Sequence, residues 1–162
     1  MRRISRLALV AYALALAVVV ADQSLKYWLL TYFHLPDRVT TPLIGPLSLT
    51  MVWNHGVSFG VFNSDAEWTR WALTAFSAGV AAILAVWAAR TEQAILAVAL
   101  GLIMGGALGN MIDRVRLGAV ADFINFGHWF PWVFNVADAA INVGSALLIW
   151  DLFLAPRKRA GA

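Results

Sequence analysis

The sequence predicts an all-α integral membrane protein, a bundle of four transmembrane helices with a small extracytoplasmic β-element between helices 1 and 2. Of its 162 residues, 61% are hydrophobic and 13% are charged, whereas about a quarter of the residues of a soluble domain are charged. Residues 7–21, 71–89 and 94–112 contain no charged residue, and residues 134–154 contain only Asp138 and Asp151. A helix needs about 20 mostly apolar residues to cross a bilayer. Four such segments are present.

These segments are expected to form one membrane-embedded domain that covers residues 1–162. The first segment also has the basic start and apolar centre of a cleavable signal peptide. Because its apolar character continues into "LKYWLLTYF", we expect it to remain as a membrane helix. The expected spans are residues 7–30, 68–89, 94–113 and 134–154.

The connection between the first two spans, about residues 34–66, is predicted to be rich in β-structure. Its segments "LSLTMVWN" and "GVSFGVF" contain many β-branched and aromatic residues, which favour strands. Between them lies "NHG", which is typical of a turn. We therefore expect two short strands around this turn.

The distribution of Lys and Arg predicts the orientation in the membrane. Four spans place both ends of the chain and the connection between spans two and three on the same side. By the positive-inside rule this side is cytoplasmic. The net charge of +3 is explained by basic ends that face anionic lipid, and it requires no nucleic-acid partner. Seven of the twelve basic residues lie on this side: Arg2, Arg3, Arg6, Arg90, Arg157, Lys158 and Arg159.

Most polar residues of the spans are predicted to lie near the outer boundary of the membrane. Ionisable groups are unfavourable inside a bilayer, so these side chains are expected to face the bundle interior and to pair with one another. Asp122 lies close by, in the loop expected between spans three and four. The polar residues within the spans at this level are Asp22, Lys26, Asn110, Asp113, Arg114, Asn135 and Asp138.

Asp122 and Asp138 are the candidate catalytic residues. Both occur among apolar residues with no basic residue within one helical turn, and apolar surroundings raise the pKa of a carboxyl group. If the two groups lie close together, they share one proton. The ionised partner can then accept a proton from water while the neutral partner donates one to a leaving group. With no cysteine in the chain, peptide hydrolysis by a carboxylate pair is the favoured enzymatic interpretation.

Other features have structural interpretations. Asp22 and Lys26 are four residues apart on one helix face and could form a structural ion pair. Asp113 with Arg114 could be an anchor at the outer boundary, and Asp151 is interpreted as an interface residue at the cytoplasmic end. A stripe of small residues that permits close helix packing is formed by Gly101, Gly105 and Gly109.

Four stretches resemble the lipoprotein signal peptidases (signal peptidase II), a family of bacterial membrane aspartyl proteases. They are "DQSLK" at residues 22–26, "NHGVSFG" at 54–60, "GGALGNMIDRVRLGAVADFI" at 105–124 and "FNVADAAINVG" at 134–144. Their order relative to the four spans also matches, so the resemblance covers essentially the whole chain. The third and fourth stretches are long and specific.

The resemblance implies that Asp122 and Asp138 are the catalytic pair. It also implies the substrate, a prolipoprotein whose Cys already carries diacylglycerol and which is cut just before that Cys. Two positions depart from the family pattern: Leu25 replaces a hydroxyl residue, and Ala121 replaces a bulky aliphatic one. The residues that the resemblance places in substrate binding or in support of the site are Asp22, Lys26, Asn54, Gly106, Asn110, Asp113, Arg114 and Asn135.

The expected protein is a monomer in the bacterial cytoplasmic (inner) membrane, with both termini cytoplasmic and the active site near the outer face. Its expected partners are diacylglyceryl-prolipoproteins and membrane lipid. No cofactor or metal is expected, because His55 and His128 lack a ligand pattern. Two other classes stay open: a proton-coupled transporter, which would place charges along a path through the bilayer, and a scaffold, which would tolerate Asn at both Asp122 and Asp138.

Overall fold

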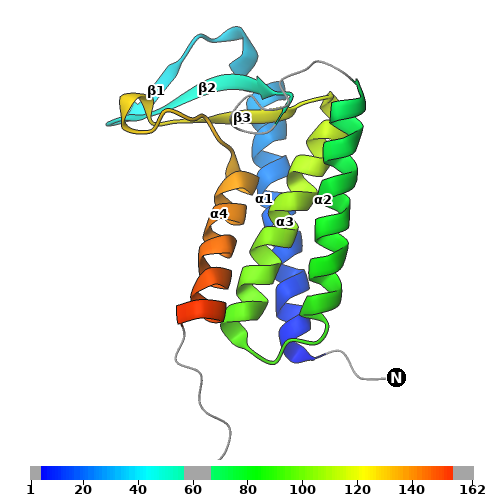
Figure 1. Ribbon diagram of the computed structural model, residues 1–162. Coiled ribbons are helices and arrows are strands. Elements are labelled where there is room, and N and C mark those ends of the chain that lie inside the picture. The colour runs from blue at the N-terminus through cyan, green and yellow to red at the C-terminus, as the bar shows by residue number, and fades with distance from the viewer. Residues whose placement is uncertain (1–4, 57–66, 155–162) are drawn as a thin grey trace, which may run out of the picture.

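The computed structural model has four long helices side by side, with a small sheet across one end of the bundle (Figure 1). It describes residues 5–56 and 67–154. In this part of the chain, four helices are long and apolar enough to cross a membrane, which confirms the predicted fold class. The helices are α1 (Arg6–Thr31), α2 (Glu67–Ala88), α3 (Ala94–Leu117) and α4 (Val136–Ile149), and a π-helical segment, Trp150–Leu154, continues α4.

Helix α3 is the central helix of the bundle. Inside the protein, 61% of its apolar stretch is buried, against 22% or less for the other three helices. Its glycines allow this close packing, because a Cβ atom at Gly101 would lie 2.6 Å from the carbonyl oxygen of Ala11, and one at Gly105 would lie 2.7 Å from that of Ala15. The predicted stripe of small residues is therefore the contact between α3 and α1.

The sheet is antiparallel, with the strand order β1-β2-β3. Strand β2 (Leu47–Asn54) is the strand predicted from "LSLTMVWN", and β1 (Thr41–Ile44) precedes it through a tight turn at Gly45, which has a positive φ of 54°. The second predicted strand, "GVSFGVF", lies almost wholly outside the described residues. Strand β1 itself was not expected.

The third strand corrects the placement of Asp122. Strand β3 (Val120–Asn125) comes from the connection between α3 and α4, which was expected to be a loop. In β3, Asp122 pairs with Val52 of β2. The pairing holds Asp122 on a fixed strand above the bundle, so its side chain is positioned by backbone hydrogen bonds.

The end of α3 explains how β3 reaches this position. The helix continues to Leu117, past the expected end at residue 113, and stops at Gly118, whose φ of 86° is typical of a helix C-terminus. Arg70 of α2 satisfies two carbonyl groups of this last turn, with bonds of 2.7 Å to Arg114 and 2.9 Å to Val115. Strand β3 then starts two residues after Gly118.

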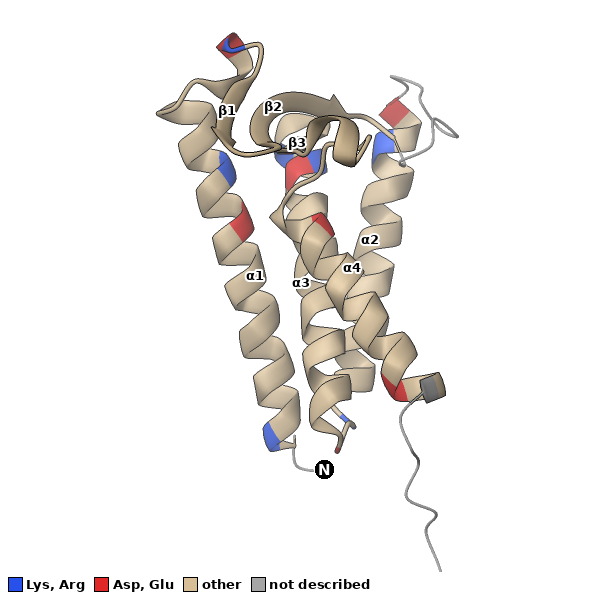
Figure 2. Cartoon of the chain, turned by 90° about the vertical axis from the view of Figure 1, so that its left-hand side faces the viewer, with Lys and Arg blue, Asp and Glu red and all other residues tan. Residues whose placement is uncertain are grey.

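Charged residues are concentrated at the ends of the bundle, and the end that carries the sheet has most of them (Figure 2). The middle turns of the helices carry none. Apart from Arg6 at its first residue, the charged residues of α1 are Asp22 and Lys26 in its second half, and both are buried. The apolar bundle thus has one polar interior, directly below the sheet.

The tight contact between α3 and α1 predicts that Gly105→Ala destabilises the protein. The added Cβ atom would meet the backbone of Ala15, and such overpacking lowers the free energy of unfolding by about 1–3 kcal/mol. Gly79→Ala on α2 is the matched control, because a Cβ atom there meets nothing within 4 Å. Thermal unfolding of the purified variants in detergent measures the difference. Equal midpoints for the two variants would contradict this account of the packing.

Candidate active site

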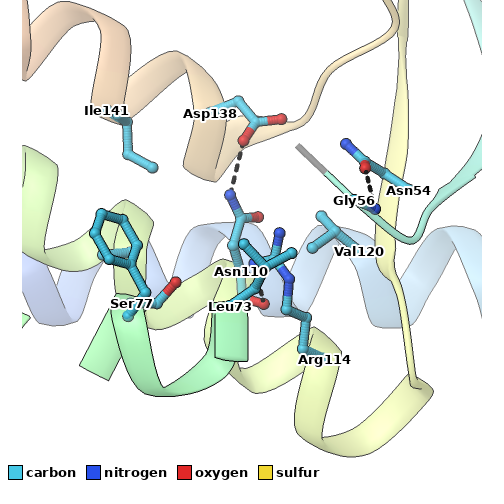
Figure 3. Close-up of a pocket in the computed structure, with 11 residues that line it drawn as sticks. Asn54, Gly56, Leu73, Ser77, Asn110, Arg114, Val120, Asp138 and Ile141 are labelled. Atoms are coloured by element: carbon cyan, nitrogen blue, oxygen red, sulfur yellow. Dashed lines mark hydrogen bonds between the residues drawn. The ribbon is translucent and has the colours of Figure 1, made fainter. Parts of the chain in front are cut away.

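A continuous chain of hydrogen bonds joins the two candidate catalytic residues. The amide nitrogen of Asn135 donates to Oδ1 of Asp122 at 2.6 Å and to Oδ1 of Asn110 at 3.2 Å. The amide nitrogen of Asn110 donates to Oδ1 of Asp138 at 2.7 Å (Figure 3). The structure therefore brings Asp122 and Asp138 to one place, although they belong to a strand and a helix.

Asp138 is positioned by the start of α4. Asn135 is the N-cap of this helix, and its Oδ1 accepts a hydrogen bond from the backbone N–H of Asp138 at 2.9 Å. In return, Oδ2 of Asp138 accepts from the backbone N–H of Asn135 at 3.3 Å. This reciprocal capping box fixes the carboxyl group at the first turn of the helix, where the helix dipole favours negative charge.

Asp122 is the more deeply buried partner. Its side chain is 2% exposed, and Oδ2 accepts a hydrogen bond from the amide of Asn54, at the end of β2, at 3.0 Å. Burial, and after it the nearby charge of Asp138, raise the pKa of Asp122 from 3.8 to about 7, against the bonds from Asn54 and Asn135 that lower it. Up to about pH 7, Asp122 therefore holds a proton.

A cleft of about 240 Å³ gives access to Asp138 (Figure 3). Arg114 lines the cleft and interacts electrostatically with both Asp138 and Asp122. The cleft thus contains charged side chains of both signs, Asp138 and Arg114, together with apolar walls. The apolar walls include Leu73 and Phe76 of α2 and Ile141 of α4.

Gly106 lets α3 and α4 meet directly below the pair. A Cβ atom at this position would collide with the carbonyl oxygen of Ala137 and lie 2.6 Å from the side chain of Ile141. Because Ala137 precedes Asp138, a larger residue at 106 would push the turn of α4 that carries Asp138 away from α3. Gly106 therefore supports the site through the close packing of α3 against α4.

Lys26 forms a buried ion network with two aspartates. Its ammonium group lies 2.8 Å from Asp22 and 2.7 Å from Asp113. The predicted Asp22–Lys26 ion pair is thus present, but the interpretation of Asp113 with Arg114 as an outer anchor is wrong. Asp113 points into the bundle, towards α1. Gln23, which sequence reasoning missed, donates to Asp113 at 2.8 Å and to the carbonyl group of Gly109 at 3.2 Å.

All ten residues expected at the site therefore lie in one network of contacts at the sheet end of the bundle. Among residues 5–56 and 67–154, no group of three or more His, Asp or Glu side chains could hold a metal ion. The only signal for Gln23 in the sequence was its place inside "DQSLK".

A serine pattern begins at Gly56 in the sequence. Residues 56–60 read Gly-Val-Ser-Phe-Gly, which matches the Gly-x-Ser-x-Gly pattern of serine hydrolases. Gly56 lines the cleft, and Ser58 lies outside the described residues. Ser58 is therefore a rival nucleophile that an experiment has to exclude.

Comparisons with known proteins show the family of the chain. A family described as "Signal peptidase (SPase) II" matches residues 14–154. The lipoprotein signal peptidase of Caulobacter vibrioides is 48% identical over 158 residues, which are 96% of this chain and 94% of the relative. That of Yersinia enterocolitica is 40% identical over 90% of this chain and 88% of its own.

A solved protein structure has a similar fold. A solved structure described as a bacterial membrane enzyme superposes with a TM-score of 0.74 at 30% identity, over 91% of this chain and 94% of its own. Family, relatives and fold agree along almost the whole chain. The protein is a multi-pass bacterial membrane protein and belongs to the signal peptidase II family of aspartic peptidases.

Proposed function

We propose that this enzyme removes the signal peptide from diacylglyceryl-modified prolipoproteins, cutting before the lipidated Cys, with Asp122 and Asp138 as the catalytic pair. The observation that carries the proposal is the hydrogen-bond chain through Asn110 and Asn135, which joins two carboxyl groups in an apolar bundle. The names of the relatives supply the substrate class, since they are lipoprotein signal peptidases.

The mechanism follows from a pair that carries one proton. The ionised carboxylate accepts a proton from a water molecule as that water attacks the scissile carbonyl group. The protonated carboxyl group donates its proton towards the leaving amine. Asn54, Asn110 and Asn135 hold the carboxyl oxygens in orientation, and Arg114 offsets negative charge in the cleft.

The cleft suits a substrate that lies in the membrane. Its apolar walls come from α2 and α4, next to the bilayer, and Asp138 lies inside it. A signal helix and acyl chains can approach from the side, while water reaches the pair from the sheet end. We infer that the sheet end is the outer face and that both termini are cytoplasmic, by the positive-inside rule. One chain supplies every residue of the site, so a monomer suffices.

Cleavage of a diacylglyceryl-modified prolipoprotein peptide by the purified protein in lipid tests the proposal. The wild type is expected to cut before the lipidated Cys and to leave the unlipidated peptide intact. Asp122→Asn and Asp138→Asn each lose the ability to move a proton, so activity falls by at least about 10²-fold. Asp151→Asn, at the other end of the bundle, and Ser58→Ala are expected to keep activity.

Three outcomes would contradict this reading. An inactive wild type on verified substrate would argue against the peptidase. Normal cleavage by either aspartate variant would exclude the pair and favour a scaffold or another nucleophile. A folded but inactive Ser58→Ala variant would point to the serine instead.

Asn135→Ala is expected to lower both activity and stability. The change removes the N-cap of α4, which stabilises by about 1 kcal/mol, and it also breaks the bonds to Asp122 and Asn110. Asn125→Ala is the matched control on β3, because Asn125 bonds to Thr50 and Gly127, away from the pair. Cleavage rates and unfolding midpoints are measured for both. Equal loss of activity in the two variants would show that the link through Asn135 is not specific.

The raised pKa of Asp122 predicts how stability depends on pH. The folded protein binds this proton up to about pH 7, whereas the unfolded chain releases it near 3.8. Between these values the folded state holds more protons, so stability decreases as pH rises from about 4 to 7. Unfolding midpoints of the wild type and Asp122→Asn at pH 5 and pH 8 measure this effect. Asp122→Asn should show a smaller decrease in unfolding midpoint between pH 5 and pH 8 than the wild type, and Asp151→Asn should show the same decrease as the wild type. An Asp122→Asn variant with the pH dependence of the wild type would contradict this account.

A further inference from the structure

Lys26 lies between two carboxylates that each hold the backbone next to a catalytic aspartate. Oδ2 of Asp22 and Oδ2 of Asp113 lie 2.8 Å and 2.7 Å from the Lys26 ammonium group. Oδ1 of Asp22 accepts the backbone N–H of Ala137 at 3.0 Å. Oδ2 of Asp113 accepts the backbone N–H of Ala121, also at 3.0 Å.

These two N–H groups belong to the residues that immediately precede the pair. Ala121 is followed by Asp122 on β3, and Ala137 is followed by Asp138 in the first turn of α4. Lys26 belongs to α1 and Asp113 to α3. A single ammonium group therefore connects four elements, and two of them carry the catalytic side chains.

The burial of the network makes the cation necessary. The side chains of Asp22, Lys26 and Asp113 are 0%, 2% and 1% exposed. Two adjacent carboxylates away from water do not both stay ionised without a cation. An ionised carboxylate is also the form that accepts a backbone N–H on one oxygen while it binds an ammonium group. Removing the charge of Lys26 therefore weakens both backbone contacts together.

We propose that Lys26 is a positioning residue that sets the separation of Asp122 and Asp138 through Asp113–Ala121 on one side and Asp22–Ala137 on the other. The inference rests on the proposed function of the pair. Lys26 does not line the cleft, so it acts on the geometry of the carboxyl groups and leaves substrate binding unchanged. The identity of the side chain at 121 is irrelevant to this contact, because only its backbone N–H takes part.

The test is a KM-against-kcat comparison on the lipidated peptide, with rates expressed per folded molecule. Lys26→Met is expected to lower kcat by about 10–10²-fold, the range in which a small misplacement of catalytic groups reduces rate, with KM unchanged within about twofold. Lys26→Arg, which keeps the charge, is expected to recover part of kcat. Gly105→Ala is the matched control, because it strains the α1–α3 contact without touching the ion network.

A double-variant cycle separates positioning from general stability. If Lys26 acts through Asp113, then Lys26→Met combined with Asp113→Asn loses kcat by no more than about twofold beyond the worse single variant. Gln23→Ala is the milder variant should Lys26→Met fail to fold, since it leaves the ammonium group in place and removes the amide bonds to the same carboxylates, to the carbonyl group of Gly109 and from Arg116. It is expected to lower kcat with KM unchanged.

The outcomes distinguish this inference from the proposed function. If Asp122→Asn and Asp138→Asn stay active, the catalytic pair itself is wrong. If those variants are inactive while Lys26→Met, or Gln23→Ala in its place, keeps the kcat of the wild type, only the positioning role is overturned. A fall in kcat for Gly105→Ala as large as that for Lys26→Met, or fully multiplicative losses in the cycle, would also overturn it.

Discussion

Asn135 is the residue in which the folding of the bundle and the assembly of the site coincide. Its side-chain oxygen caps α4, and its side-chain nitrogen donates to Asp122 and Asn110. An N-cap must lie at the first turn of its helix, so the start of α4 also fixes where the amide nitrogen points. Asn135 is fully buried, and it leaves neither end of its amide without a partner. The same side chain therefore caps the helix and aligns the two carboxyl groups.

The balance of charge around the pair explains why a proton is retained there. The network below the sheet contains four carboxyl groups, from Asp22, Asp113, Asp122 and Asp138, and in the described part of the chain the cations that interact with these carboxyl groups are Lys26 and Arg114. Lys26 already forms ion pairs with Asp22 and Asp113. A further negative charge on both members of the pair would be poorly compensated in a buried site. Retaining one proton reduces this excess, and it also provides the mixed protonation state that acid–base catalysis needs.

The sequence predicted the parts of this structure that depend on composition and helical spacing. Four apolar segments became four helices, and the glycines four residues apart became the α1–α3 contact. Strand β3 was missed because its partner β2 lies far away along the chain, with Asn54 and Asp122 separated by 68 residues. Asp113 was assigned to its sequence neighbour Arg114, but consecutive helical residues point in different directions. Its true partner, Lys26, comes from another helix. Gln23 carries no charge, so apart from its place inside "DQSLK" the sequence contained no indication of its polar contacts.

The location of the site reconciles two opposing requirements. A carboxyl group keeps its proton near neutral pH only in apolar surroundings, yet peptide hydrolysis consumes water. Deep in the bundle, α3 packs against Ala11 and Ala15 too closely to admit water. Outside the membrane, solvation would let both carboxyl groups ionise. The level between α4 and the sheet meets both needs, because Asp122 is buried on β3, beside β2, while Asp138 opens into the cleft. Under the proposed function, a substrate anchored by acyl chains would present its scissile bond at this same level, the depth at which the pair retains a proton.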